Sequence, residues 1–380
     1  MKKLTEEQEL MLENLREVMK RECPESYLNE VERKQEYPYK LAKVLYGNGF
    51  LTMGIPEEYG GTPADTFTLC LFYEELGKLG APWSAVMSAL TVGDVLLFGS
   101  EKQKWLSMEM LKKHEGLCYS LGITEPGAGS DDNAIATTYT RRNGKVYLNG
   151  HKCFITLAAE APYMLCFAKN PEEPNPKKAI TMWMVDMKAK GVTTAHMEKI
   201  GSRCAPLYEV YLEDVELEEE DIIGKEGEGF MNLMKNFEAE RVLGAVGALG
   251  WAEAAYADAC TYANQRVQFG KPIGSFQLIQ KRVTEMAIRI ENMRNLVYNT
   301  AEDIDAGRPA QISSALCKYY VAIASGEVID SAMQVLGGIG YTCDHRVSRL
   351  WRDVRSLRIG GGTDEVMIHI LGRAILKKYR

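Results

Sequence analysis

The sequence predicts an α+β protein with an N-terminal helical domain, a middle β-domain and a C-terminal helical bundle domain. Apolar residues recur at helical spacing up to residue 116, short apolar strands separated by turn signals fill residues 117–225, and helical spacing returns over residues 226–380. With 380 residues, 46% of them hydrophobic and 26% charged, the chain is long enough for a globular protein of several lobes. We therefore expect domains over residues 1–116, 117–225 and 226–380.

The first helix should begin at a capping box. Thr5 and Gln8 have the spacing of this motif and precede the apolar positions Leu10 and Leu15. A turn-rich break follows at residues 55–61, and helical spacing then resumes.

Apolar runs in the middle of the chain are short enough to be strands. Turn signals separate them, such as Arg142-Asn143-Gly144 and the proline-containing segment 171–176. This pattern predicts a small antiparallel barrel or sandwich. Examples of the expected strands are residues 117–123, 145–150, 163–168, 179–185 and 209–215.

Composition excludes several classes of protein. The net charge of −7 and the scattered lysines argue against nucleic-acid binding. The charged N-terminus lacks a signal-peptide core, and no apolar run approaches the roughly 20 residues of a membrane helix. Nine cysteines without a C-x-x-C pair and five isolated histidines suit neither a disulfide framework nor a metal site. These features predict a cytoplasmic protein with reduced thiols.

The segment from Thr124 to Asp131 is the most distinctive local sequence. A predicted strand leads into this polar turn with two glycines, an arrangement that suits a cofactor because glycine lets the backbone approach a ligand closely or adopt positive φ. An ordinary surface turn has a similar composition. A dinucleotide fingerprint fails because Asp132 stands where its third glycine is needed, and Walker and G-x-S-x-G sequences are absent.

Several runs together resemble one family, the acyl-CoA dehydrogenases. They occur in the family's order and spacing and extend over essentially the whole chain. The runs are residues 55–61, 123–131, 152–156, 266–270, 276–277, 334–338 and 362–363. The resemblance implies the acyl-CoA dehydrogenase fold, with a middle β-barrel domain and a C-terminal four-helix bundle, and FAD between the domains.

The resemblance assigns the flavin to two segments of the middle domain. Thr124 would lie at the flavin ring, and Phe154 stands where the family often has tryptophan, so the aromatic face is kept and the indole donor is lost. The residues expected to line the flavin and pyrophosphate are Leu121, Ile123, Thr124, Ser130, Phe154, Ile155 and Thr156.

The adenosine diphosphate half of FAD is expected in the C-terminal domain, across a subunit interface. Arg266 suits a phosphate because its guanidinium is forked and permanently charged, whereas its structural alternative is a surface salt bridge. The residues implied here are Arg266, Phe269, Gln277, Gln334, Gly337 and Gly338. Thr363 and Glu365 are further cofactor candidates, although Glu365 stands where the family frequently has glutamine.

The reaction of the family needs a base for the α-proton of a thioester, and the usual one is missing. Many members carry a glutamate directly before the C-terminal Gly-Thr, where this chain has Gly361. Other members carry the base earlier, directly before an arginine, and Glu240 matches that position. Glu240 shares a helix face with Leu243, Gly244 and Gly247, so a carboxylate there is costly unless it has a function or a partner. The structural alternative is an ion pair with a neighbouring arginine.

The resemblance also implies how the acyl-CoA is held. The backbone N–H of Gly361 and a ribityl hydroxyl of the flavin would meet the thioester oxygen, a role that does not need a side chain. Ser130, Glu238, Arg241 and Gly362 are the other candidates for contacts to the substrate.

Residues 137–145, 262–270, 351–353 and 371–380, together with Glu240 and Gly361, resemble the crotonobetainyl-CoA reductase branch of the family. Such enzymes of carnitine metabolism interconvert crotonobetainyl-CoA and γ-butyrobetainyl-CoA and exchange electrons with an electron-transfer flavoprotein. The resemblance also implies a homotetramer. The alternatives are a dehydrogenase for a short or branched aliphatic acyl-CoA, and a non-catalytic scaffold that binds flavin or acyl-CoA.

Overall fold

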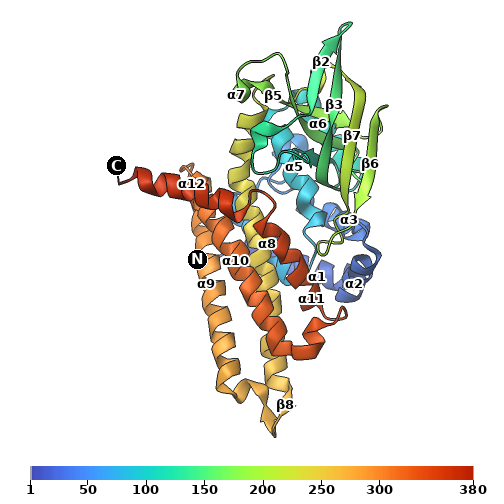
Figure 1. The fold of residues 1–380 in the computed structure, drawn as a ribbon. Helices are drawn as coiled ribbons and strands as arrows, with labels where there is room; N and C mark the ends of the chain where they lie inside the picture. The colour runs from blue at the N-terminus through green and yellow to red at the C-terminus, as the bar shows by residue number, and fades with distance from the viewer. Residues whose placement is uncertain (1, 380) are drawn as a thin grey trace.

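Figure 1 shows a long molecule with a β-sheet at one end and a small hairpin at the other, joined by one long helix, α8. The computed structural model describes residues 2–379, so Met1 and Arg380 lie outside the described residues, as do the side chains of Ala89, Lys177 and Asn236.

The N-terminal part is helical, and its first helix begins as the sequence predicts. Thr5 Oγ1 accepts a hydrogen bond from the Gln8 N–H at 3.2 Å, and Gln8 Oε1 accepts one from the Thr5 N–H at 3.1 Å. This pair confirms the capping box. The helices are α1 (Glu6–Glu22), α2 (Glu25–Lys34), α3 (Tyr39–Gly47), α4 (Thr66–Lys78), α5 (Ser84–Phe98) and α6 (Glu101–Lys113).

The middle domain is one curled sheet in which the strands β1-β4-β2-β3-β7-β6 follow one another and β5 pairs with the free side of β4. Asn143 and Gly144, with φ of 53° and 77°, form the tight turn between β2 and β3 that the sequence predicts. The strands are β1 (Tyr119–Gly122), β2 (Thr138–Arg142), β3 (Lys145–Thr156), β4 (Tyr163–Lys169), β5 (Ile180–Asp186), β6 (Val192–Met197) and β7 (Leu207–Leu217).

The sheet differs from the predicted antiparallel one in two ways. β1 pairs with β4 in parallel, because the β2–β3 hairpin lies between them in the chain and brings β4 back in the direction of β1. β2 and β6 were not predicted as strands. β6 is an edge strand whose residues are mostly exposed, so it lacks the apolar alternation that marks a half-buried strand.

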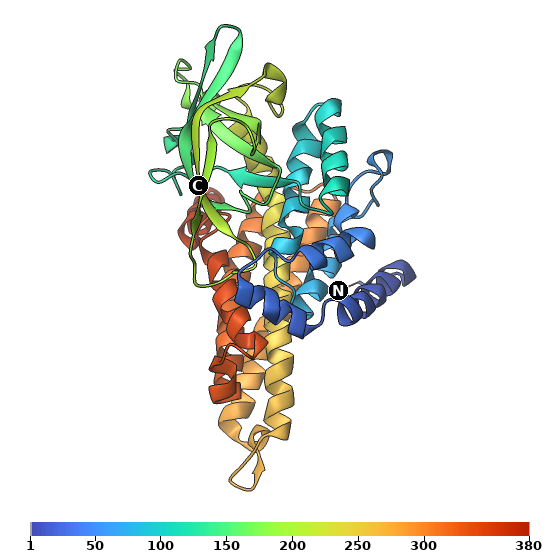
Figure 2. The same ribbon diagram turned by 90° about the vertical axis from the view of Figure 1, so that its right-hand side faces the viewer.

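The C-terminal part contains the long helices α8 (Gly229–Gln265), α9 (Gln277–Asp305) and α10 (Gln311–Leu336), followed by α11 (Arg346–Val354) and α12 (Asp364–Lys377). A small hairpin of β8 (Val267–Gln268) and β9 (Lys271–Pro272) joins α8 to α9 and projects from the molecule (Figure 2). Short elements complete the chain: α7 (Pro176–Ala179) and the 3₁₀ turns η1 (Phe50–Thr52), η2 (Glu57–Tyr59), η3 (Asp132–Ala134), η4 (Glu219–Asp221), η5 (Ile273–Ser275), η6 (Gly337–Tyr341) and η7 (Arg355–Arg358).

Glycines bring α4 directly against the backbone of α8. A Cβ on Gly250 would lie 2.2 Å from the carbonyl oxygen of Glu74, and one on Gly77 would lie 2.6 Å from the carbonyl oxygen of Gly247. Larger residues at Gly77 or Gly250 would separate the two helices. The N-terminal helices are therefore packed onto α8 at backbone contact, which fixes their position relative to the C-terminal domain.

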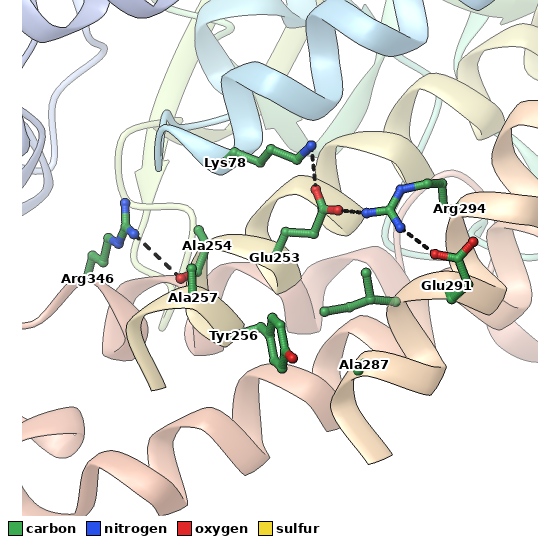
Figure 3. A pocket seen from close by; sticks show the side chains of 10 residues that line it. Lys78, Glu253, Ala254, Tyr256, Ala257, Ala287, Glu291, Arg294 and Arg346 are labelled. Atoms are coloured by element: carbon green, nitrogen blue, oxygen red, sulfur yellow. Dashed lines mark hydrogen bonds and ion pairs between the residues drawn. The ribbon is translucent and has the colours of Figure 1, made fainter. Parts of the chain in front are cut away.

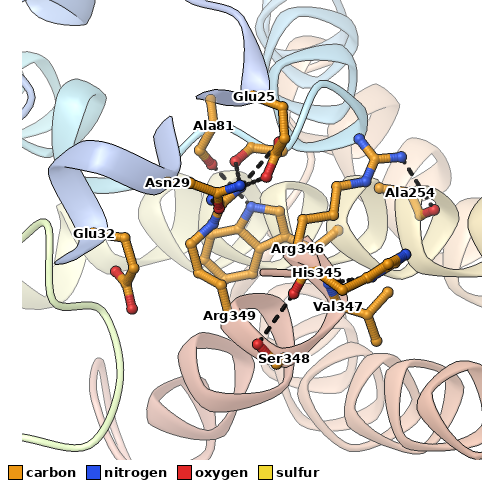
Figure 4. A network of polar contacts seen from close by, with 12 residues as sticks. Glu25, Asn29, Glu32, Ala81, Ala254, His345, Arg346, Val347, Ser348 and Arg349 are labelled. Carbon is orange, nitrogen blue, oxygen red and sulfur yellow. Dashed lines mark hydrogen bonds and ion pairs between the residues drawn. The ribbon is translucent and has the colours of Figure 1, made fainter. Parts of the chain in front are cut away.

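The α11 helix joins the N-terminal helices to the C-terminal domain. The buried guanidinium of Arg349 points toward Glu25 and Asn29, donating to Asn29 Oδ1 at 2.7 Å and lying 3.1 Å from Glu25 Oε1 (Figure 4). It also donates to the carbonyl oxygen of Gly80 at 3.0 Å. Because a guanidinium presents several donors in fixed directions, one side chain holds three segments together.

Within residues 2–379, we find no helix that combines the length and the apolar character needed to cross a membrane.

Candidate active site

The two segments predicted to hold the flavin lie next to each other. The Cys153 N–H donates to the carbonyl oxygen of Thr124 at 2.9 Å, and Lys152 Nζ donates to the carbonyl oxygen of Ile123 at 3.1 Å. The end of β1 and the distal half of β3 are thereby tied together. Leu121, Ile123 and Thr124 are all partly exposed, so their side chains are accessible from this side of the sheet.

Phe154 is turned out of the sheet by an irregularity in β3. The register between β3 and β7 shifts between Lys152 and Ile155, and Phe154 adopts φ of 58° with 59% of its surface exposed. A bulky residue rarely adopts positive φ, and such strain is found mainly at functional sites. The shift presents an aromatic ring to an incoming group. Ile155, by contrast, is buried in the sheet core, so only its backbone is available to a cofactor, while Thr156 is partly exposed.

A buried ion pair inside the middle domain fixes these two segments. Lys152, whose side chain is 0% exposed, lies with Nζ 2.7 Å from Glu125 Oε1 and also donates to the carbonyl oxygen of Phe167 at 2.7 Å. Glu125 accepts further hydrogen bonds from the N–H groups of Ala136 and Thr137, at 2.5 and 3.0 Å. Burial alone would raise the pKa of Glu125, but the charge of Lys152 and these hydrogen bonds outweigh it and lower the pKa. Glu125 is therefore held as a carboxylate with its oxygens occupied.

The turn after Thr124 is held by its own backbone. The N–H groups of Glu125 and Ala128 each donate to the carbonyl oxygen of the other residue at 3.0 Å. Gly127 and Gly129 do not have positive φ, and a Cβ on either would meet no atom within 4 Å. The sequence suggested two functions for these glycines, positive φ or close approach of a ligand. The structure excludes positive φ and leaves open space in which a ligand could approach the backbone. Ser130 is exposed on the same turn.

These features fit the flavin end of FAD. The partly exposed residues Leu121, Ile123 and Thr124, the open 127–130 turn and the exposed ring of Phe154 belong to adjoining segments, since the Cys153 N–H donates to the carbonyl oxygen of Thr124. The apolar ring and the backbone groups suit a flat heteroaromatic system with a polar edge.

Glu240 lies on α8, partly buried, on the helix face that the sequence predicts. Burial raises the pKa of Glu240 to about 7, and the adjacent charge of Arg241 opposes the shift. Leu243 is buried beside it, and a Cβ on Gly244 would meet no atom within 4 Å, so open space adjoins the carboxylate one turn along the helix. A carboxylate with such a pKa can take up a proton near neutral pH.

Two aromatic rings close this face of α8 beyond Gly244. A Cβ on Gly247 would lie 2.6 Å from the ring of Trp83, whose centroid is 5.1 Å from that of Tyr73. Burial raises the pKa of Tyr73, and the negative charge of Glu240 adds to this increase. The Tyr73 hydroxyl is therefore within electrostatic range of the Glu240 carboxylate. Tyr73 and Trp83, which we call the aromatic pair, were not singled out from the sequence because they come from segments far from α8 in the chain.

A buried lysine of α10, Lys318, lies between the turn at residues 360–363 and α8. Lys318 of α10 donates from Nζ to the carbonyl oxygen of Gly362, and the charge of Arg241 acts on the pKa of the same amine. Arg241 is itself buried, lies over the ring of Phe237 at 5.3 Å and has no hydrogen-bond partner at Nε among the described residues. Burial lowers the pKa of Arg241, while Glu238 and Glu240 act to raise it. The two base positions of the family are thus linked in space.

The turn at residues 360–363 has no carboxylate. Gly361 and Gly362 have φ of 66° and 97°, and a Cβ on Gly361 would meet no atom within 4 Å. Thr363 caps α12 by accepting a hydrogen bond from the Val366 N–H at 3.3 Å, which leaves the O–H of its hydroxyl able to donate. Glu365 is exposed in the first turn of α12.

One chain does not bring both halves of the expected FAD site together. Figures 1 and 2 place the hairpin and the end of α10 at the opposite end of the molecule from the sheet. Phe269 at the hairpin tip is 92% exposed and lies 6.0 Å from Phe276, centroid to centroid. The residues expected to bind adenosine diphosphate all lie here and are exposed: Arg266, Phe269, Gln277, Gln334, Gly337 and Gly338.

A cavity of about 440 Å³ between α8 and α9 is separate from these residues (Figure 3). Its charged groups neutralise one another, since Glu253 lies 3.0 Å from Lys78 and also pairs with Arg294. Arg294 in turn lies 2.7 Å from Glu291.

Comparison with known proteins settles the family. Models of the N-terminal, middle and C-terminal domains of acyl-CoA dehydrogenase match residues 5–110, 120–215 and 227–376. The chain belongs to the acyl-CoA dehydrogenase family. It is accordingly an FAD-dependent oxidoreductase that acts on the CH–CH group of acyl-CoA.

Relatives align with this acyl-CoA dehydrogenase along its whole length. It is 48% identical over 377 residues to the probable acyl-CoA dehydrogenase YdiO of Escherichia coli (strain K12), covering 99% of this chain and 98% of the relative. Butyryl-CoA dehydrogenase from Megasphaera elsdenii is 31% identical with a TM-score of 0.92, covering 99% of this chain and 100% of that one. A chain from a structure described as the electron transferring flavoprotein of Acidaminococcus fermentans also aligns with a TM-score of 0.92 at 31% identity, covering 99% of both.

Replacing Lys152 by Met tests the buried ion pair. The variant leaves Glu125 as an uncompensated buried charge, so we expect a loss of about 3–5 kcal/mol in the free energy of unfolding and weaker retention of FAD. Urea unfolding followed by circular dichroism, with flavin absorbance after gel filtration, measures both.

The matched control is Lys145→Met on the same strand. Lys145 pairs with Glu216 at the surface, and its loss should change the stability by less than about 1 kcal/mol. Equal effects of the two substitutions would contradict the importance assigned to the buried pair.

Proposed function

We propose that this enzyme interconverts a short acyl-CoA and its trans-2-enoyl-CoA with Glu240 as the α-proton base, and that the pair is γ-butyrobetainyl-CoA and crotonobetainyl-CoA. The observation that carries the proposal is the partly buried Glu240, whose pKa is raised to about 7 next to open space, in a chain with Gly361 at the usual base position. The local runs that resemble the crotonobetainyl-CoA reductases support the choice of acyl group.

Glu240 suits proton abstraction because its surroundings disfavour charge. The α-proton of a thioester is weakly acidic, and a carboxylate stripped of water is a stronger base than one in solution. Arg241 keeps part of the charged form available, since it opposes the effect of burial on the pKa of Glu240. Glu240 takes up the α-proton when the saturated acyl-CoA is oxidised and returns it when the enoyl-CoA is reduced, so the same residue serves both directions of the reaction.

FAD, when bound, supplies the acceptor for the hydride that leaves the β-carbon. Thr124, Phe154 and the 127–130 turn would hold its flavin end. Ile155 would contribute through its backbone, and Thr363 through a hydroxyl that also caps α12.

The enolate oxygen needs a donor, and the turn at Gly361 supplies a backbone N–H. Loss of the side chain at this position does not remove that donor. Glu238, Arg241 and Ser130 are the proposed contacts to the rest of the thioester, with Arg241 Nε as an available buried donor.

The aromatic pair of Tyr73 and Trp83 supports a cationic acyl tail. The pair closes the α8 face about two helical turns from Glu240, which limits the length of the acyl group. A trimethylammonium group is attracted to aromatic faces, and the nearby Glu240 carboxylate adds to the attraction. The competing aliphatic substrate would use the same rings through apolar contact alone, and a scaffold would bind acyl-CoA without reaction.

We further propose that FAD is shared between subunits of a homotetramer and that an electron-transfer flavoprotein exchanges electrons with it. The separation of the two halves of the FAD site within one chain supports the first, and the exposed Phe269 offers an apolar contact to another subunit. The alignment with a chain from an electron transferring flavoprotein structure supports the second.

A panel of acyl-CoA thioesters tests the choice of substrate. Mixing the oxidised enzyme with γ-butyrobetainyl-CoA should bleach the flavin faster than butyryl-CoA or isovaleryl-CoA does. Trp83→Ala should weaken binding of γ-butyrobetainyl-CoA by about tenfold and that of butyryl-CoA less, because only the former loses a cation–π contact. Trp105→Ala, at an exposed tryptophan, is the control. A preference for the aliphatic thioesters would favour the alternative dehydrogenase, and no bleaching with any thioester would favour the scaffold.

Removing the base tests the mechanism. Glu240→Gln should retain FAD and lose flavin reduction by at least about a hundredfold in a stopped-flow measurement. Near-normal reduction would refute the assignment. Adding Gly361→Glu should restore part of the rate because its Cβ has open space, although positive φ at this position costs about 1–2 kcal/mol.

The raised pKa of Glu240 predicts an acid limb in the pH profile. The base must be unprotonated, so on the acid side the rate of flavin reduction should fall about tenfold per pH unit below a pKa of about 7. Stopped-flow rates at low substrate concentration report this pKa in the free enzyme. A flat rate down to the pKa of an ordinary glutamate would contradict the desolvation of Glu240.

A further inference from the structure

Lys318 occupies a place in the active site that the chemistry of the base and the flavin does not explain. It belongs to α10, is 6% exposed, and directs its amine to the carbonyl oxygen of Gly362. A buried lysine is costly unless its charge is used, because the ammonium loses its water. The charged amine therefore serves as a hydrogen-bond donor to a turn of consecutive glycines.

The turn that Lys318 contacts needs an external restraint. Gly360, Gly361 and Gly362 follow one another, and glycine has more backbone freedom than any other residue. Gly361 and Gly362 both have positive φ, and a Cβ on Gly361 would meet no atom within 4 Å, so side-chain packing does not hold this residue. The start of α12 is fixed separately, by the Thr363 cap and by an Arg358–Asp364 pair at 2.7 Å.

We propose that Lys318 is a positioning residue. It holds the Gly361–Gly362 turn in the orientation in which the Gly361 N–H donates a hydrogen bond to the thioester oxygen. This inference rests on the proposed function, because it assigns the turn the enolate oxygen. The bond from Lys318 fixes the peptide unit between Gly362 and Thr363, so it anchors the C-terminal end of the turn that presents the Gly361 N–H. A charged donor makes this a stronger restraint than a neutral hydrogen bond.

Lys318 also lies within electrostatic range of the helix that carries the proposed base. Arg241, next to Glu240 on α8, faces Lys318, as do Asp364 and Glu365 of α12. Burial lowers the pKa of Lys318 to about 8, while Asp364 acts to raise it, Arg241 to lower it and Glu365 to raise it. Since the ammonium is lost as the pH rises through this pKa, the restraint weakens on the alkaline side.

The experiment measures flavin reduction by the preferred acyl-CoA in wild type, Lys318→Met, Lys318→Arg and the surface control Lys281→Met, from about pH 6 to about pH 10. The wild-type rate should fall above about pH 8, where Lys318 loses its proton. Below about pH 8, Lys318→Met should lower the rate about a hundredfold, because a displaced donor is inefficient, with little change in acyl-CoA affinity or FAD content. Above this pH the difference from wild type should shrink, because wild type loses the same restraint. Lys281→Met should match wild type.

Lys318→Arg separates a positioning role from general packing. Arginine stays charged throughout this range, so the variant should regain a substantial part of the rate lost in Lys318→Met and lose the alkaline fall. If Lys318→Met does not fold, the alkaline limb of wild type and its absence in Lys318→Arg still decide the matter.

Two results would overturn the inference. An unchanged rate and pH profile in Lys318→Met would overturn it alone. No flavin reduction in wild type with any acyl-CoA would overturn the proposed function, and the inference with it.

Discussion

The buried ion pair of Lys152 and Glu125 is the interaction on which the electron-accepting side of the site depends. Lys152 gives its donors to Glu125 and to the carbonyl oxygens of Ile123 and Phe167, so one side chain joins the turn after β1 to strands β3 and β4. Removal from water makes each of these bonds costly to break. That rigidity explains how Phe154 persists at positive φ beside it, since strained backbone survives only where its surroundings fix it.

The two carboxylates near the site have opposite environments, and this separates their functions. Glu125 is paired and hydrogen-bonded, so its pKa is lowered and it stays charged as part of the framework. Glu240 is desolvated next to open space, so its pKa is raised into the range where proton transfer occurs. In the proposed mechanism the middle domain therefore organises the cofactor, while α8, α10 and the glycine turn organise the acid–base chemistry.

Much of the architecture was predictable because local signals agree with it. The capping box at Thr5, the turn at Asn143-Gly144 and the change from helical to strand patterning all have short-range physical causes. The parallel pairing of β1 with β4 and the polar edge strand β6 could not be predicted, because strand direction and edge position depend on long-range topology. Glu240 is proposed as the base through its sequence neighbours. Lys318 and Trp83 were missed because their partners, Gly362 and Gly247, are distant in the chain and contribute only backbone or space.

The central claim is that Glu240 moves the α-proton, and exchange of that hydrogen with D₂O tests it most directly. The enzyme is incubated in D₂O with a saturated acyl-CoA, and deuterium at the α-carbon is measured by mass spectrometry. The account predicts that wild type exchanges the α-hydrogen with a rate that rises through a pH of about 7, and that Glu240→Gln with full FAD does not exchange it. Exchange at the wild-type rate in Glu240→Gln would contradict the account.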